Sequence, residues 1–449
     1  MDDSQLKYYF PPDLSKPNNL SVNYDKYITR DPMVDEHIDA LLDGLIGIRD
    51  REDQQIKKEE DEVSETTVKG DGDDSKPISS GNISGSSSKG SATRADFICY
   101  RGILTKIMCT PYSRNEPWEL RATLYKGTIY IEESVTLEKR KLSHGTNDRL
   151  KLMSYWGYRF ETICNISKPV SELRRTKIRK RVSKSIQDSD RLGNANSSTL
   201  LLSEHHQQEG SQPSHKRSRL ELELSATTEV SSRSSGSNDG GGDNDNDDEG
   251  EEYSEEIDLQ DPELIGRLEG TVDTNLQYCT IARTKIGRNS IIMGAEVDCI
   301  SEPKRPAPFN PLSHYIELKT SRIIGSDRER NNFEKHKLLK FWAQSFLPGI
   351  PTIIVGFRDD DGNVVTVETF KTMEIPRLVR GKDGAWDSTI CINFLDRVFD
   401  FLRKLIVIDD PEVTYSIRWA APFKAIEVEY EGKKNAFLTK RFLNRWGRP

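Results

Sequence analysis

The sequence lacks the cysteine pairs and the long apolar runs that mark several classes of protein. Its 449 residues include six cysteines, none of which forms a C-x-x-C pair. This spacing argues against both a structural zinc site and a disulfide framework. No apolar run approaches the ~20 residues of a membrane-spanning helix, and the N-terminus lacks the basic and apolar regions of a signal peptide. These absences predict a soluble intracellular protein with reduced cysteines and no membrane partner.

Hydrophobic residues are also few for a fully globular chain. They make up 34% of the sequence against 31% charged residues, a balance that predicts disordered segments. The formal net charge is −8, but residues 239–258 hold many aspartates and glutamates and neither lysine nor arginine. The rest of the chain therefore carries a net positive charge. An acidic total is no argument against a nucleic-acid ligand here.

The composition divides the chain into ordered and low-complexity parts. Residues 1–50 form a polar N-terminal arm, and residues 51–94, rich in charged residues and then in Ser and Gly, are typical of a disordered linker. Residues 183–256 predict a disordered acidic and Ser-rich insertion. Ordered patterns fill residues 95–182 and 257–449. We interpret these two segments as a single α/β (α+β) domain interrupted by the insertion.

Hydrophobic periodicity predicts the elements of this domain. A hairpin is expected over 120–132, with Lys126-Gly127 at its turn. Ser326 caps a helix over 327–346, one face of which carries Gln344 and is expected to point toward the acidic motifs described below. A second helix covers 387–406. Further strands are expected at 277–284, 290–300, 351–358, 364–370, 414–419 and 425–430.

Two acidic motifs lie in strand-like runs that are rich in Ile, Val, Tyr and Leu. Because side chains alternate along a strand, Glu296 and Asp298 share one face of the first strand. By the same argument Glu317 and Lys319 share one face of the next. If the two strands pair, three carboxylates and one ammonium group gather in a small patch.

A further predicted strand over 153–164 contributes to the same patch. Its alternation places Arg159 and Glu161 on one face. Glu161 is then a fourth carboxylate for the patch.

Carboxylates gathered in this way favour a bound metal. Left uncompensated they repel and raise one another's pKa, whereas a hard divalent cation, Mg²⁺ or Mn²⁺, removes the repulsion. Two such cations beside a lysine form a phosphoryl-transfer site, which binds the scissile phosphate, activates a water and stabilises the leaving oxygen. These residues alone leave open an alternative, namely amphipathic strands with acidic faces toward solvent.

The motifs also follow one another in a specific order. They are Tyr100-Arg101-Gly102, Gly157-Tyr158-Arg159-Phe160-Glu161, Gly294-Ala295-Glu296-Val297-Asp298-Cys299, Tyr315-Ile316-Glu317-Leu318-Lys319, Trp342-Ala343-Gln344 and Gly356-Phe357-Arg358. Glu-x-Asp followed by Glu-x-Lys resembles the pattern of PD-(D/E)xK nucleases. The complete set resembles the decapping exoribonuclease (DXO) family, most closely its fungal nuclear members that accompany the nuclear 5′→3′ exoribonuclease. The resemblance covers about 95–182 and 275–430.

This resemblance implies a fold and a set of metal ligands. The fold is two packed mixed β-sheets flanked by helices, with a PD-(D/E)xK-nuclease-like core and the active site in the cleft between the sheets. The implied ligands are Glu161, Asp298, Glu317 and the backbone carbonyl of Leu318. Glu296 would act through bound water or at a second metal.

The resemblance also implies roles for three groups that are not metal ligands. Lys319 and Gln344 would contact the reacting phosphate or water. Arg101 would hold the RNA backbone or the 5′ end. Arg159 is added as a substrate-binding residue from strand alternation alone.

The activity that the resemblance implies is hydrolysis of aberrant RNA 5′ ends in the nucleus. It includes release of pyrophosphate from 5′-triphosphate RNA, removal of incompletely methylated caps and NAD caps, and 5′→3′ exonuclease action in some members. RNA 5′ ends and the nuclear 5′→3′ exoribonuclease are the implied partners. Two alternatives stay open: a mainly non-catalytic stabilising partner of that exoribonuclease, and a PD-(D/E)xK deoxyribonuclease.

Overall fold

The computed structural model describes residues 5–31, 34–35, 37–68, 93–134, 147–179, 253–304 and 310–447. It divides into two units, one made of residues 1–174 with 257–449 and the other of residues 175–256. In the second unit β6 (Arg175–Arg179) pairs with β7 (Tyr253–Ile257). The prediction of a disordered insertion over 183–256 is therefore wrong for residues 253–256, which are part of a strand. The other residues of that range lie outside the described part of the chain.

One sheet of the first unit has six strands in the order β13-β12-β11-β10-β1-β5. The strands are β1 (Tyr8–Tyr9), β5 (Asn165–Ile166), β10 (Cys299–Ile300), β11 (Tyr315–Arg322), β12 (Thr352–Arg358) and β13 (Val364–Lys371). Strands β11 and β12 are parallel and the β12–β13 pair is antiparallel, so the sheet is mixed. Strand β12 is apolar along most of its length because both of its faces are covered.

The other sheet has seven strands in the order β15-β14-β3-β4-β2-β9-β8. They are β2 (Phe97–Tyr100), β3 (Trp118–Tyr125), β4 (Thr128–Glu133), β8 (Cys279–Ile286), β9 (Asn289–Glu296), β14 (Thr414–Trp419) and β15 (Glu427–Gly432). The predicted hairpin is confirmed as β3–β4. Lys126 and Gly127 turn it with φ of 50° and 74°, the positive angles that a tight hairpin turn of this kind requires.

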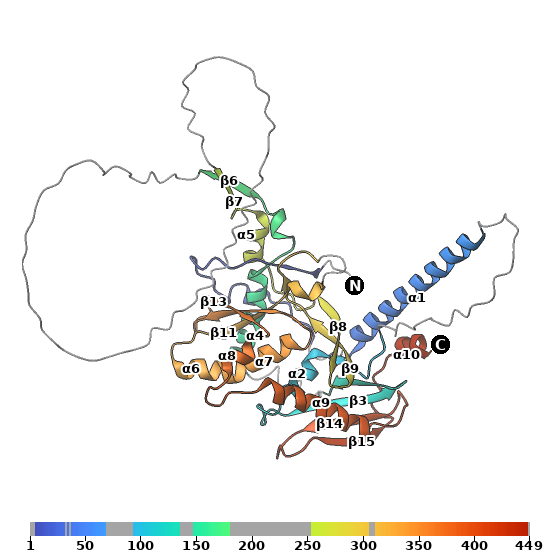
Figure 1. Cartoon of the computed structure of the whole chain (residues 1–449). Helices are drawn as coiled ribbons and strands as arrows, with labels where there is room; N and C mark the ends of the chain where they lie inside the picture. Colours follow the sequence, from blue (N-terminus) through green and yellow to red (C-terminus); the bar gives the residue numbers. More distant parts are fainter. Residues whose placement is uncertain are drawn as a thin grey trace, which may run out of the picture. The chain divides into compact units, whose positions relative to one another are not determined.

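Helices complete the unit. They are α1 (Asp39–Val68), α2 (Arg101–Cys109), α4 (Asp148–Ile163), α5 (Pro262–Glu269), α6 (Asp327–Asn332), α7 (Leu339–Phe346), α8 (Ile375–Val379), α9 (Ser388–Leu405), α10 (Lys440–Gly447), the π-helical turn η5 (Phe333–Leu338) and the short turns η2 (Tyr24–Lys26), η3 (Val170–Glu172) and η4 (Pro311–His314). The prediction of two mixed sheets flanked by helices is confirmed (Figure 1). No described helix is long and apolar enough to cross a membrane.

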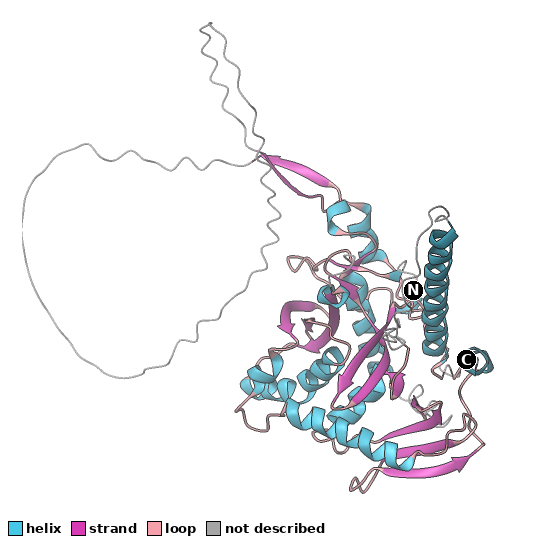
Figure 2. Cartoon of the chain, turned by 45° about the vertical axis from the view of Figure 1, so that its right-hand side comes forward, coloured by secondary structure: helices cyan, strands magenta, loops and turns pink. Residues whose placement is uncertain are grey.

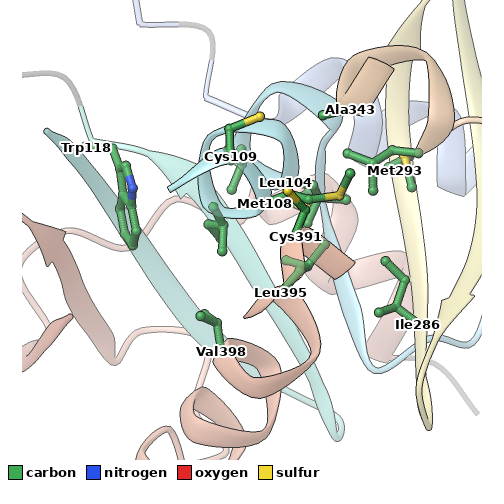
Figure 3. Packing of buried hydrophobic residues seen from close by; sticks show 14 of the residues in the cluster. Leu104, Met108, Cys109, Trp118, Ile286, Met293, Ala343, Cys391, Leu395 and Val398 are labelled. Carbon is green, nitrogen blue, oxygen red and sulfur yellow. The ribbon is translucent and has the colours of Figure 1, made fainter. Parts of the chain in front are cut away.

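The main core joins both sheets to helices α2, α7 and α9. Figure 3 shows Leu104 and Met108 of α2 beside Cys391 and Leu395 of α9, with Trp118 of β3 farther along the cluster. This packing fixes α2, and therefore its first residue, relative to the sheets. A smaller core on the other face of the six-stranded sheet holds α4 against β11 and β12.

The N-terminal arm is part of this unit, which corrects its assignment as a separate region. Strand β1 pairs with both β10 and β5 inside the six-stranded sheet, and Leu20 is fully buried. The first turns of α1 bury Leu41 and Leu45 on the seven-stranded sheet, beside Phe442 of α10. The arm therefore completes the domain.

The predicted linker over 51–94 is also wrong in its first part. Helix α1 continues to Val68 as a single element (Figure 2). The side chains of 51–59 are largely exposed, which explains why their composition resembles that of a linker. Residues 69–92 of the predicted linker lie outside the described part.

Candidate active site

The four predicted carboxylates line one cavity of about 360 Å³. Its wall combines helices α2, α4 and α7 with strand β11 and the end of β9. The lining residues are Arg101, Ser154, Gly157, Tyr158, Glu161, Gln277, Glu296, Asp298, Glu317, Leu318, Lys319, Thr320 and Gln344. Eight of the nine predicted site residues are in this set, and Arg159 is not.

The segment that carries Glu296 and Asp298 crosses from one sheet to the other. Strand β9 of the seven-stranded sheet ends at Glu296, and β10 of the six-stranded sheet begins at Cys299. The sequence predicted one strand over 290–300 that pairs with the next strand. This is only partly right, because residues 290–300 form two strands and only the second of them, β10, pairs with β11. The two carboxylates reach the cavity because the crossing occurs between them.

Strand β11 has a free edge at the cavity. Its pairing with β10 ends at Ile316, and among the described strands only β12 pairs with the residues beyond. Asp298 Oδ2 accepts a hydrogen bond of 2.6 Å from the Leu318 N–H on this edge. The N–H and C=O of one strand residue point to the same side, so the Leu318 carbonyl also points toward the cavity. This orientation agrees with its predicted role.

Glu161 comes from helix α4, not from a strand. The strand predicted over 153–164 is wrong, since residues 148–163 are helical. A helix brings Ser154, Tyr158 and Glu161 to one face because they are spaced by four and three residues, and all three line the cavity. The next residue back, Phe160, packs on β12 at Gly356, where a Cβ would lie 2.4 Å from the ring. Gly356 therefore allows the close approach that sets the position of Glu161.

The structure does not bring Arg159 into the site. Its guanidinium donates hydrogen bonds to the backbone carbonyls of Gly270, at 2.6 Å, and of Leu268, and the side chain is buried. Strand alternation placed it beside Glu161, but on a helix the two residues are about 200° apart. Arg159 instead holds the C-terminal end of α5 and Gly270, the residue directly after it.

Glu317 is the most strongly bound of the four carboxylates. It is fully buried and accepts hydrogen bonds from Arg101 Nη1 at 2.8 Å and from Lys319 Nζ at 2.5 Å. Arg101 is the first residue of α2, which follows directly from β2. The close contact of Gly294 with the Tyr100 ring, where a Cβ would lie at 2.8 Å, keeps β9 and the start of α2 near each other.

The pKa values of the cavity's acids shift in different directions. Burial raises the pKa of Asp298 to about 7, and Glu317 adds to the rise. Burial, and then Asp298, raise the pKa of Glu161 well above its usual range. Burial also acts on Glu317, but Lys319 and Arg101 outweigh it and lower its pKa. Two acids of the cavity therefore lack enough positive charge, as the sequence predicts for carboxylates without a metal.

The oxygen ligands of the cavity are of the type that binds a hard cation, but their side chains are not arranged around a common centre. Four carboxylates and one carbonyl are all oxygen donors, which Mg²⁺ and Mn²⁺ prefer. Within the described residues, however, no three His, Cys, Asp or Glu side chains form a ready group of ligands. Both oxygens of Glu317 face Arg101 and Lys319. A divalent ion fits this site if it displaces those contacts.

Several lining residues were not predicted as site residues. Ser154, Gly157 and Tyr158 on α4, and Gln277 before β8, contribute to the cavity wall. Reading 148–163 with a helical period would have grouped the α4 residues with Glu161. Gln277 carries no signal in the sequence, because it reaches the cavity from an irregular segment.

Comparison with known proteins places this geometry in a family. A family model described as "RAI1 like PD-(D/E)XK nuclease" matches residues 1–192 and 253–443. The chain belongs to this family. The match also includes the N-terminal arm, which the sequence motifs alone left outside the resemblance.

Named relatives and solved structures agree with the family match. The chain is 29% identical to "Decapping nuclease RAI1" of Neurospora crassa over 451 residues, covering 98% of this chain and 77% of that protein. It is 27% identical to the human "Decapping and exoribonuclease protein" over 423 residues, covering 93% and 74%. Rai1 of Scheffersomyces stipitis shares the fold with a TM-score of 0.64 at 22% identity, covering 99% and 90%.

A second solved structure is Candida albicans Rai1 in complex with pU5-Mn²⁺. It matches with a TM-score of 0.62 at 23% identity and also covers 99% and 90% of the two chains. At these identities the solved structures show the fold. The family of this chain is one of nucleases, so we describe the protein as a hydrolase.

Proposed function

We propose that this protein is a divalent-metal-dependent hydrolase of RNA 5′ ends. The single observation that best supports this is the shared cavity, in which four carboxylates meet Arg101, Lys319 and Gln344 in a member of a nuclease family. The named relatives are decapping nucleases and exoribonucleases. A cavity with acids for metal and cations for phosphate matches that chemistry.

The cofactor in this proposal is Mg²⁺ or Mn²⁺, two ions per site. Glu161, Asp298, Glu317 and the Leu318 carbonyl would hold one ion, and Glu296, at the end of β9, would act through water or at the second. Bound divalent ions supply an activated water and charge stabilisation for the leaving oxygen. Solved Rai1 structures contain Mn²⁺ with pU5 in one case and calcium with (3′-NADP)⁺ in another.

The chain's own cations orient the substrate. Lys319 and Arg101 hold Glu317 between them, so both ammonium and guanidinium groups already point into the cavity. If Glu317 held a divalent ion, these two donors would be available to a phosphate of the RNA. Gln344 on α7 also lines the cavity and provides a neutral donor and acceptor for the reacting phosphate or water.

The substrates in this proposal are RNAs with aberrant 5′ ends. They include 5′-triphosphate, incompletely methylated cap and NAD-capped ends, because each presents a phosphate near the 5′ terminus for the same attack by water. Which bond is cut depends on which phosphate lies over the carboxylates. Digestion in the 5′→3′ direction uses the same site on a 5′-monophosphate.

A product assay on RNAs that differ only at the 5′ end tests the proposal. Products are resolved by mass, with Mg²⁺ or Mn²⁺ and after chelation. We expect hydrolysis that chelation abolishes and that the Glu296→Ala/Asp298→Ala double variant lacks. The matched control is Glu427→Ala/Glu429→Ala, which removes two exposed acids of the same spacing from β15. Equal activity of wild type and the site variant would refute the proposal, and preferential cleavage of duplex DNA would favour the deoxyribonuclease alternative.

Two parts of the sequence interpretation stay predictions. One is a nuclear location. The other is association with a nuclear 5′→3′ exoribonuclease, for which Val365 and Met373, exposed on and just after β13, offer an apolar surface. Co-purification with that exoribonuclease and slower thermal inactivation of it would support the association. A variant with charged residues at both positions should lose the stabilising effect without losing hydrolysis.

A further inference from the structure

The N-terminal arm lies beside the segments that carry two of the candidate metal ligands. Its strand β1 is placed between β10 and β5 in the six-stranded sheet and pairs with both. Strand β10 begins directly after Asp298, and β5 begins four residues after Glu161. One short strand of the arm therefore joins the two segments.

Main-chain hydrogen bonds on both sides of β1 fix this arrangement. The Ile300 N–H donates to the Lys7 carbonyl at 2.9 Å, and the Phe10 N–H donates to the Cys164 carbonyl at 2.8 Å. Cys164 directly follows the last residue of α4, the helix that carries Glu161. The arm is thus bonded to the chain two residues after one candidate ligand and three residues after the other.

Helix α5 holds the arm in this place. Arg267 donates hydrogen bonds from Nη1 to the carbonyl of Phe10, at 2.7 Å, and from Nη2 to that of Pro11, at 3.0 Å. Its guanidinium also lies 4.6 Å from the centre of the Phe10 ring, a favourable cation–π contact. These contacts oppose movement of β1 away from its two neighbours.

Asn165, the first residue of β5, adds a direct contact to Asp298. Its Nδ2 donates a hydrogen bond of 3.1 Å to the main-chain carbonyl of Asp298, and the carboxylate of Asp298 accepts one from the Leu318 N–H. Asp298 lies between β9 and β10, where no strand pairing of the described residues includes it. The two hydrogen bonds therefore hold its main chain and its side chain in place of regular pairing.

The other end of the Asn165 amide is poorly suited to a purely structural role. Its Oδ1 is buried and accepts no hydrogen bond from the described residues. A buried amide oxygen without a donor destabilises a fold, and such groups are uncommon in native structures. The one described hydrogen bond of the side chain goes to Asp298. This indicates that Asn165 serves the placement of that residue.

We propose that Asn165 is a positioning residue for Asp298, and that the N-terminal arm holds Asn165 and the end of α4 in place beside β10. Together they set the separation between the carboxylates of Asp298 and Glu161. That separation matters because Mg²⁺ and Mn²⁺ hold their oxygen ligands at nearly fixed distances. The proposal rests on the proposed function and adds positioning groups to the same site.

The test compares Asn165→Ala with Asn289→Ala. Asn289 is the matched control because it is also a buried asparagine on a strand, but it is hydrogen-bonded to Asp396 and Arg403 of α9, at the end of β9 that is remote from Glu296. Asn289→Ala should lower the midpoint of thermal unfolding and leave Mn²⁺ affinity unchanged.

In Asn165→Ala the dissociation constant for Mn²⁺, measured by calorimetry without RNA, should rise about tenfold, since removing a group that orients a metal ligand costs about 10- to 100-fold. At saturating Mn²⁺, kcat on 5′-triphosphate RNA should fall about tenfold. KM for RNA should stay unchanged, because Asn165 acts through Asp298. Arg267→Met, which releases the arm but keeps an apolar stem, should weaken Mn²⁺ binding by a smaller factor.

Unchanged Mn²⁺ affinity and kcat in Asn165→Ala would overturn the proposal. So would a loss of Mn²⁺ affinity that Asn289→Ala reproduces at equal loss of stability, because the effect would then be a general one. Unchanged Mn²⁺ affinity in Arg267→Met would overturn the role of the arm.

The Mn²⁺ measurement also separates this proposal from the proposed function. A wild type that hydrolyses no RNA, yet binds Mn²⁺ in an Asn165-dependent way, would refute the hydrolase and support the positioning role. A wild type that hydrolyses RNA, with Mn²⁺ binding that does not depend on Asn165, would refute only the positioning role. A wild type that binds no Mn²⁺ and hydrolyses no RNA would refute both.

Discussion

Two buried carboxylates in this molecule each accept hydrogen bonds from two basic side chains, yet only one of the carboxylates belongs to a candidate active site. Glu317 accepts hydrogen bonds from Arg101 and Lys319. Glu132, on β4 of the other sheet, accepts them from Arg121 at 3.0 Å and His37 at 2.7 Å. Both carboxylates are almost fully buried. Burial and pairing therefore do not distinguish them.

The difference lies in what surrounds each pair. Two further acids contact the Glu132 cluster, and both are more exposed than Glu132: Glu431, which lies 3.1 Å from Arg121, and Asp35, which lies 3.8 Å from His37. Near Glu317 three more carboxylates share a cavity with it. The Glu132 cluster holds elements of one sheet to the start of α1, while the Glu317 cluster has surplus negative charge facing a space. Unbalanced buried charge beside a cavity, rather than an ion pair as such, marks the candidate site.

The sharpest test of this comparison removes one surplus carboxylate. Asp298→Asn keeps an acceptor for the Leu318 N–H but removes a metal ligand. We expect hydrolysis to fall by about a thousandfold, while the midpoint of thermal unfolding is unchanged or raised, because repulsion among the four carboxylates decreases. Enzyme kinetics and calorimetry measure the two effects. A variant that loses stability together with activity would show that Asp298 is mainly structural.

The complementary test removes the balanced carboxylate. Glu132→Ala leaves Arg121 and His37 without their buried acceptor, so we expect a loss of about 3 kcal/mol in the free energy of unfolding. The kcat/KM of the folded protein should be unchanged. Chemical denaturation measures the stability, and Glu133→Ala, at the exposed neighbouring position, is the control. Reduced kcat/KM in Glu132→Ala would link the two clusters.

A third test concerns a buried cation, Arg159, for which no described carboxylate lies within ion-pair distance. Arg159→Met keeps the apolar stem but leaves the carbonyls of Leu268 and Gly270 without a donor. We expect a loss of about 2 kcal/mol in unfolding free energy and no change in KM for RNA. Lys151→Met, on an exposed part of the same helix, is the control. A raised KM at unchanged stability would instead support the substrate-binding role that the sequence suggested.

The elements that sequence reasoning found are those with a clear period or turn. The β3–β4 hairpin, β12 and α9 have 6 to 18 residues per element, with apolar positions at intervals of two or at helical intervals. The acidic motifs could be recognised because the two-residue spacing in Glu-x-Asp and Glu-x-Lys places both charged side chains on one face of a strand. Convergence of these residues in one cavity could be inferred only through family resemblance, since it depends on tertiary packing.

The errors have specific physical causes. Residues 153–164 are rich in aromatics that favour strands, but packing of Tyr155, Trp156 and Phe160 against the six-stranded sheet selects the helix. Strand β1 has two residues and therefore no detectable period; its place between β10 and β5 is set by tertiary pairing. The run from β9 through β10 looks continuous because nothing in its composition marks the change of sheet.

That change of sheet gives the molecule a mechanical property. Glu296 belongs to one sheet and Glu317 to the other, and only Val297 and Asp298 span the interval between β9 and β10. A sliding displacement of one sheet past the other would leave every strand intact and still pull the acids apart. The distances among the four carboxylates thus depend on the alignment of the two sheets, so we expect substitutions far from the cavity that alter this alignment to reduce turnover.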